Sequence, residues 1–103
     1  MDTTEKLTIG ECLEIWISAL EKKDDEGYTY IPKHGNKYIK IVRRSPTGSQ
    51  SVHAFVNIQT QRVHKAASWV KPSPTSNYHL IDDIEALQRE CKFNGGYLYA
   101  RKM

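Results

Sequence analysis

The segment 51–72 constrains the fold most, because it reads as two alternating strands joined by a short turn. The runs SVHAFVN and RVHKAAS flank IQTQ, and successive side chains of a strand face opposite sides of a sheet. If Asn57 pairs with Arg62 across this four-residue loop, the register is set and Phe55 faces His64. One face of the hairpin then carries His53, Phe55, Arg62 and His64. The other face, which we expect the N-terminal helix to cover, carries Val52, Ala54, Val56, Val63, Lys65 and Ala67.

The neighbouring segments extend this hairpin into a larger antiparallel sheet. Residues 27–44, GYTYIPKHGNKYIKIVRR, predict two strands around a turn at 34–36, where glycine or asparagine accepts positive φ. Pro32 places the first strand at an edge or ends it, because proline donates no ladder hydrogen bond. In the second strand, Ile39 and Ile41 point to one side. Tyr38, Lys40, Val42 and Arg44 point to the other. We expect a last short strand over 97–103.

Two helices are expected at the ends of the chain. Residues 8–23, TIGECLEIWISALEKK, begin with the capping-box spacing of Thr8 and Glu11. Their apolar residues recur at the spacing of one helix face. These residues are Ile9, Cys12, Leu13, Trp16, Ile17 and Leu20. Residues 81–91, IDDIEALQREC, predict a second, shorter helix. The two cysteines, Cys12 and Cys91, are expected to be small buried apolar side chains rather than a disulfide.

These elements predict one α+β domain over residues 1–103. It has a small antiparallel sheet of four to five strands, with the N-terminal amphipathic helix and the shorter C-terminal helix packed on one face. No stretch approaches the roughly 18 apolar residues that a membrane span needs. The N-terminus opens acidic and lacks the basic region of a secretory signal. We therefore expect a cytoplasmic protein with no membrane partner.

The distribution of charge is more informative than the net charge of +3. Residues 1–27 contain eight acidic residues and three lysines, a net charge of −5. Residues 28–81 contain no Asp or Glu and eight Lys or Arg, a net charge of +8, and they also contain all four histidines. A long segment with one sign of charge creates a field that attracts anions. Nucleic acid, a nucleotide or an acidic protein surface are the candidate partners.

A resemblance covers about half of the chain. The block 35–72, GNKYIKIVRRSPTGSQSVHAFVNIQTQRVHKAASWVKP, resembles a group of small proteins encoded by tailed bacteriophages, in the strands 37–41 and 51–56 and the segment 63–72. The tail NGGYLYAR, residues 94–101, is similar too. The chain departs from the group at Gln61, where glycine is expected at a left-handed turn position, and at His64, where tyrosine is commoner. The resemblance implies a phage accessory protein in the cytoplasm of the infected host cell, and it supplies no activity.

Aromatic and basic residues on one sheet face suggest a ligand-binding surface. Many modules hold single strands in this way, because bases stack on rings and cations meet phosphates. The alternative is an ordinary solvated sheet, since Tyr and Phe are good strand residues. The candidate ligand-binding residues are Tyr38, Lys40, Arg44, His53, Phe55, Arg62, His64, Lys65, Trp69 and Lys71. Tyr28 and Tyr30 are candidates for the same surface.

The function expected from these features is non-enzymatic binding of a nucleic acid or nucleotide, in genome handling or counter-defence. The alternative is a phage-encoded inhibitor that binds a host defence or transcription protein through a charged pole or a sheet edge. A small enzyme would need a carboxylate close to His53 or His64. No metal or other cofactor is expected, because the histidines lack a third and fourth ligand nearby. A homodimer that covers the sheet face remains an open alternative.

Overall fold

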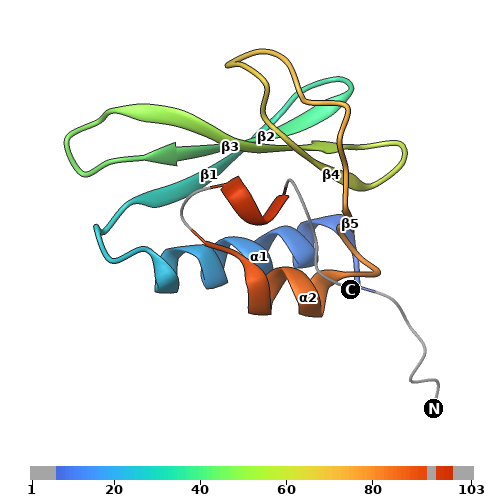
Figure 1. Cartoon of the computed structure of the whole chain (residues 1–103), viewed down its shortest axis with the longest axis horizontal. Coiled ribbons are helices and arrows are strands. Elements are labelled where there is room, and N and C mark those ends of the chain that lie inside the picture. The colour runs from blue at the N-terminus through green and yellow to red at the C-terminus, as the bar shows by residue number, and fades with distance from the viewer. Residues whose placement is uncertain (1–6, 93–94, 99–103) are drawn as a thin grey trace.

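A five-stranded antiparallel sheet in the order β1-β2-β3-β4-β5 is the centre of the fold, and two helices cover one of its faces (Figure 1). The computed structural model of the chain describes residues 7–92 and 95–98. The antiparallel sheet with two helices on one face confirms the predicted α+β class. The strands are β1 (Thr29–His34), β2 (Tyr38–Arg44), β3 (Gln50–Asn57), β4 (Arg62–Lys65) and β5 (Tyr78–His79). The helices are α1 (Ile9–Lys23), α2 (Ile84–Glu90) and the short 3₁₀ helix η1 (Gly95–Leu98).

Helix α1 begins with the predicted capping box. The Glu11 amide donates to Thr8 Oγ1 at 3.1 Å, and the Thr8 amide donates to Glu11 Oε1 at 2.8 Å. Both groups would otherwise be unpaired at the helix start. The apolar face of α1 packs against the sheet and α2 in one continuous core. The fully buried members from α1 are Cys12, Leu13, Trp16 and Leu20.

Strand β1 is an edge strand, one of the two outcomes that Pro32 predicted. The hairpin of β3 and β4 also has the predicted register, with Phe55 opposite His64 and Val56 opposite Val63. Its turn is stabilised by Asn57, whose side-chain oxygen accepts hydrogen bonds from the amides of residues 59 and 60. The valines of this hairpin, Val56 and Val63, face α1 and are buried in the core.

A β-bulge in β3 overturns the predicted face of His53. The register of β2 and β3 shifts between Ile41, which pairs with Ala54, and Val42, which pairs with Val52, so that His53 is an extra residue. A bulge interrupts the alternation of side chains. His53 therefore points into the helix-covered side, where it is 5% exposed and its ring lies 6.1 Å from that of Trp16. Val52 was expected to face the helices. It instead pairs with Val42 and lies on the face of the sheet away from the helices.

The C-terminal part differs most from the expectation. Residues 95–98 form η1 rather than the start of a strand, and Leu98 is buried; the rest of the expected strand lies outside the described residues. Strand β5 was not predicted. It pairs with β4, with Arg62 opposite His79. The chain has to turn after β5, so α2 begins at residue 84 and not at the predicted residue 81. Among residues 7–92 and 95–98, none of the helices has the length and hydrophobicity that a transmembrane segment requires.

Candidate functional site

The side of the sheet away from α1 and α2, here called the outer face, carries the predicted basic and aromatic residues. Ile39 and Ile41 belong to the helix-covered core, so alternation along β2 sends the residues between and beside them outward. Pairing across the sheet extends the face from β1 to β4. The outer face comprises Lys33, Tyr38, Lys40, Val42, Arg44, Val52, Phe55, Arg62 and His64.

A closed loop after β4 lies over the outer face (Figure 1). Ala66 bridges Pro72, and the amides of Ala67 and Ser68 donate to the Lys71 carbonyl at 2.9 and 3.1 Å. These bonds narrow the loop and present residues 68–70 at its tip. Trp69 is 46% exposed and Val70 is 76% exposed, so the tip offers apolar surface to a partner.

An aromatic cluster with a central lysine connects this loop to the sheet. Lys40 Nζ lies 4.5 Å from the centre of the Trp69 ring and 5.9 Å from that of Phe55, within the range of cation–π attraction. Tyr38 meets Phe55 edge to face at 5.9 Å and His64 at 6.3 Å. Phe55 is only 3% exposed. It supports the cluster from below, so of the three predicted stacking residues only Tyr38 and Trp69 are accessible.

A shallow hollow of about 300 Å³ lies beside Trp69. It is open to solvent on one side, between the loop and the start of β3. Its walls are mostly small side chains and backbone, which allow a flat ligand to approach closely. The lining residues are Ser51, Val52, Ala66, Ala67, Ser68 and Trp69.

Among the described residues, the outer face concentrates cations and carries no carboxylates that would offset their charge. Lys33 and Lys40 lie directly opposite each other on β1 and β2. Within residues 7–92 and 95–98, the ion pairs involve Arg43, His79 and Arg89, and none involves Lys33, Lys40 or Arg44. The strands and the loop come from the segment 28–81, which has no Asp or Glu. Arg44 and Lys71 are exposed and Lys40 is half-buried, so anions can reach them.

Two predicted ligand residues instead hold the chain around the loop in place. Arg62 donates from Nε to Ser76 Oγ at 3.3 Å and from an Nη to the Ser76 carbonyl at 3.1 Å. His64 Nδ1 lies 3.0 Å from the Ser73 carbonyl. Because a carbonyl only accepts, this nitrogen carries the proton. Both side chains are half-buried, and we assign them a positioning role.

Two further predicted residues lie on the other side of the sheet. His53 is turned away by the bulge, and its Nε2 lies 2.7 Å from the hydroxyl of Tyr97. Lys65 is paired with Ala54, a core residue, and so faces the helix side, as its strand position predicted. Neither contributes to the outer face, because strand alternation and the bulge direct both side chains towards the helices.

The remaining tyrosines of the expected surface, Tyr28 and Tyr30, instead contact the ion pair formed by Arg43 and Asp24. Tyr30 is 3% exposed, and its hydroxyl donates to Asp24 at 2.7 Å. The guanidinium of Arg43 lies 3.6 Å from the centre of the Tyr28 ring. Arg43 also pairs with Asp24 at 2.9 Å and with Glu26 at 3.4 Å. Part of the acidic end of α1 is thus engaged in structural contacts inside the protein.

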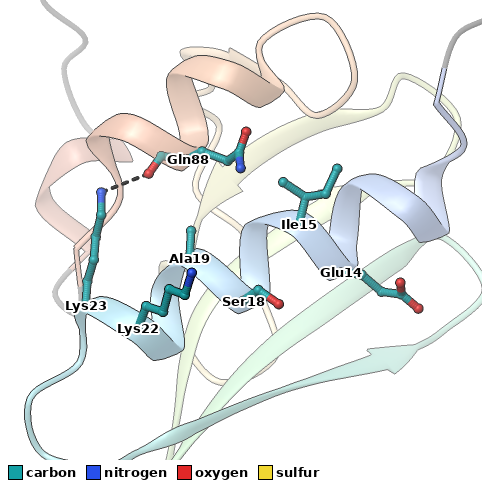
Figure 2. Close-up of a pocket in the computed structure, with 7 residues that line it drawn as sticks. All are labelled: Glu14, Ile15, Ser18, Ala19, Lys22, Lys23 and Gln88. Atoms are coloured by element: carbon teal, nitrogen blue, oxygen red, sulfur yellow. Dashed lines mark hydrogen bonds between the residues drawn. The ribbon is translucent and has the colours of Figure 1, made fainter.

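A second hollow, of about 560 Å³, lies between the helices on the far side of the molecule (Figure 2). Lys23 spans its end and donates to the carbonyls of Gln88 and Arg89 at 2.8 Å, which caps the C-terminus of α2. None of the predicted ligand residues lines it. Its lining residues are Glu14, Ile15, Ser18, Ala19, Lys22, Lys23 and Gln88. Within the described residues, no three His, Cys, Asp or Glu side chains are grouped to hold a metal ion.

Comparison with known proteins gives a family and no activity. The profile of a family of unknown function (DUF7717) matches residues 3–100. Searches of the curated proteins and of the solved structures gave no significant match.

Proposed function

The chain belongs to this family of unknown function, and we propose that it binds a nucleic acid or nucleotide, without catalysis, on the outer face of its sheet. The observation that carries the proposal is the arrangement of Lys40. Its ammonium lies 4.5 Å from the centre of the Trp69 ring, and its backbone position on β2 is directly opposite that of Lys33 on β1. An aromatic surface bordered by cations complements a ligand that offers both a base and a phosphate.

The electrostatics favour an anionic ligand. Like charges directly opposite each other on neighbouring strands destabilise a sheet by a few tenths of a kcal/mol up to about 1 kcal/mol. Lys33 and Lys40 form such a pair, and the acid-free segment around them provides no carboxylate to offset it. A bound phosphate would relieve this repulsion. The unfavourable pair is more easily understood as part of a binding surface than as part of a solvated sheet.

The exposed ring favours a ligand with a base rather than a simple anion. Trp69 leaves 46% of its surface exposed at the tip of a loop that its own backbone hydrogen bonds hold closed. A tryptophan that served only to anchor the loop would be buried in the sheet. Stacking of a base on such a ring contributes about 1–3 kcal/mol and tolerates any base.

The cellular setting of the proposal comes from the resemblance to tailed-bacteriophage proteins. In an infected cell, a small cationic binding module in the host cytoplasm would serve genome handling, or would sequester a nucleotide signal of host defence. The competing proposal, an inhibitor that docks on a host protein, has less support. Asp24 and Glu26 of the acidic pole are paired with Arg43 inside this chain.

The test is binding of labelled single-stranded and duplex DNA and RNA, and of free nucleotides, at low and near-physiological salt. Affinity should fall steeply with salt, because each neutralised phosphate contributes about −0.7 to −0.9 to the logarithmic slope. Arg44→Glu should weaken binding and make the slope shallower by about 1 or more. Lys22→Glu is the matched control, since it makes the same charge change on exposed α1, on the other side of the molecule.

Two results would overturn the proposal. One is no binding of any nucleic acid or nucleotide at low salt. The other is an equal loss of affinity in Arg44→Glu and Lys22→Glu, which would mean that overall charge rather than the outer face attracts the ligand. Salt-insensitive capture of a host protein instead would favour the inhibitor.

A further inference from the structure

We infer that the hollow beside Trp69 is a subsite for one unpaired base, so that the outer face accepts a single strand rather than a duplex. The inference rests on the proposed function and narrows its ligand. It depends on three features: the shape of the hollow, the position of the Trp69 ring, and the placement of cations on either side along β2.

The hollow has the size and walls of a site for a single planar group. Its volume of about 300 Å³ is at the lower limit for small-molecule sites, which span roughly 300–1,000 Å³. Small side chains from the loop, Ala66, Ala67 and Ser68, form one wall, and Ser51 and Val52 of β3 form the other. Methyl groups and backbone suit the flat face of a base. Among the lining residues of the loop, Ser68 carries a hydroxyl that can donate to or accept from its edge.

Trp69 is held in an orientation that suits stacking. Its ring lines the hollow and also carries Lys40 Nζ at 4.5 Å. This contact restrains the ring, so less conformational freedom is lost when a base stacks on it. A base within a duplex is already stacked between its neighbours and paired along its edge. Only an unpaired base can be extended into a hollow of this kind.

The cations lie where the phosphates on either side of that base would be. Val42 pairs with Val52, which lines the hollow, and Lys40 and Arg44 stand two residues to either side of Val42 on the same face. Their Cα atoms are four residues apart along β2, roughly 13 Å at the rise of a strand. Both side chains are long enough to reach inward. A strand whose base enters the hollow would thus have its two flanking phosphates near Lys40 and Arg44.

The experiment compares three labelled probes of equal length by fluorescence anisotropy: an oligothymidylate, the same strand with abasic sites in place of its bases, and a duplex. The oligothymidylate should bind most tightly. Trp69→Ala should weaken its binding about 5- to 150-fold, the range expected for one lost base stack. The same change should leave binding of the abasic strand nearly unchanged. Trp69→Phe should retain most of the affinity, because it keeps an aromatic ring.

The control variant is Val70→Ala, which alters the neighbouring exposed side chain at the loop tip but not the lining of the hollow. It should bind like the unaltered protein. Because Trp69 is exposed, circular dichroism should show that Trp69→Ala remains folded.

The possible results test the base subsite separately from the proposed binding function. Equal, salt-steep binding of the thymidylate and abasic strands would overturn the base subsite and leave the cationic face intact. Tighter binding of the duplex, or full affinity in Trp69→Ala, would also overturn the subsite. No binding of any probe would overturn the proposed function together with the inference.

Discussion

The Nε atom of Arg43 lies 2.9 Å from a carboxylate oxygen of Asp24, whose side chain is only 1% exposed. The Tyr30 hydroxyl donates to the same oxygen at 2.7 Å, and the Glu26 amide donates to the other oxygen at 3.0 Å. This network joins the end of α1 to β1 and β2. Asp24 and Glu26 come from the acidic segment 1–27, and Tyr30 and Arg43 come from the basic segment 28–81. The network therefore attaches the two segments to each other.

Asp24→Asn should destabilise the fold by about 3 kcal/mol. Removing one partner of a buried ion pair leaves an uncompensated charge and typically costs about 3–5 kcal/mol. Arg43 retains the more exposed Glu26, which favours the lower end of this range. Urea unfolding measures the change. Asp25→Asn, at the exposed next position, is the control and should change stability by less than about 0.5 kcal/mol. Equal losses in the two variants would contradict a special role of Asp24.

The same pair predicts the response of stability to acid. Burial alone would raise the pKa of Asp24, but hydrogen bonds from Arg43, Tyr30 and the Glu26 amide, with the charge of Arg43, outweigh burial and lower it. A carboxyl with a depressed folded pKa stabilises the fold fully above its unfolded value, near 3.9, and loses this contribution as the pH falls through the folded pKa. Unfolding free energy should therefore decline below about pH 4. The decline should be smaller in Asp24→Asn, and equal declines would contradict the assignment.

Tyr97→Phe should destabilise the protein by about 2–3 kcal/mol. The Tyr97 hydroxyl accepts a hydrogen bond from Trp16 Nε1 at 3.1 Å and lies 2.7 Å from His53 Nε2. Its loss removes a hydrogen-bond partner from both side chains. An unsatisfied buried donor such as the Trp16 indole N–H costs about 1–3 kcal/mol, and the lost contact with His53 adds to this cost. Burial also raises the pKa of Tyr97, so the hydroxyl keeps its proton. Thermal unfolding tests this against Tyr28→Phe, which keeps its ring on Arg43 and should be nearly neutral.

Gln61→Gly should stabilise the protein by up to about 1 kcal/mol. Gln61 has φ of +63°, and its amide and carbonyl hydrogen bonds fix it there. A side chain in this left-handed region costs roughly 1–2 kcal/mol, and glycine avoids this cost but loses about 0.5–1 kcal/mol of backbone entropy. Gln59→Gly, in the same turn, is the control and should not stabilise. A lower melting temperature for Gln61→Gly would show that its side chain makes a favourable contact.

Native Cys12 and Cys91 should react slowly with a thiol reagent. Both are free and buried, at 0% and 1% exposure, and burial raises the pKa of each thiol. The thiolate is the reactive form, so a raised pKa and poor access act together. Labelling should be complete only in denaturant. Rapid modification of one cysteine in the folded protein would indicate local opening of the α1 and α2 layer.

The hairpin register could be predicted from sequence, but the side on which His53 lies could not. Asn57 is a turn former, and alternation carries the register along β4, so the Phe55 and His64 pair followed directly. A bulge depends on how β3 fits against β2 and the helices above it, and no local sequence signal marks the extra residue. One inserted residue was enough to reverse the expected faces of His53 and Val52.

The candidate site was predictable in its cations and less so in its shape. The acid-free segment marked Lys40 and Arg44, whose faces follow from strand alternation. The hollow beside Trp69 depends on Ala66 bridging Pro72, a contact across a proline-containing loop that strand patterns do not reveal. Strand β5 has only two residues, Tyr78 and His79, too few for an alternating pattern to appear.

The layering of charge would affect how the molecule meets the proposed polyanionic ligand. Exposed acids, among them Glu11, Glu14 and Glu21, lie on α1, while the sheet layer is built from the segment with net charge +8. Opposite charge on opposite layers gives the protein an electric dipole across its thickness. In the field of a polyanion such a dipole experiences a torque that turns the outer face forward before contact. Association should then be faster than random orientation allows, with an advantage that fades as the Debye length shortens.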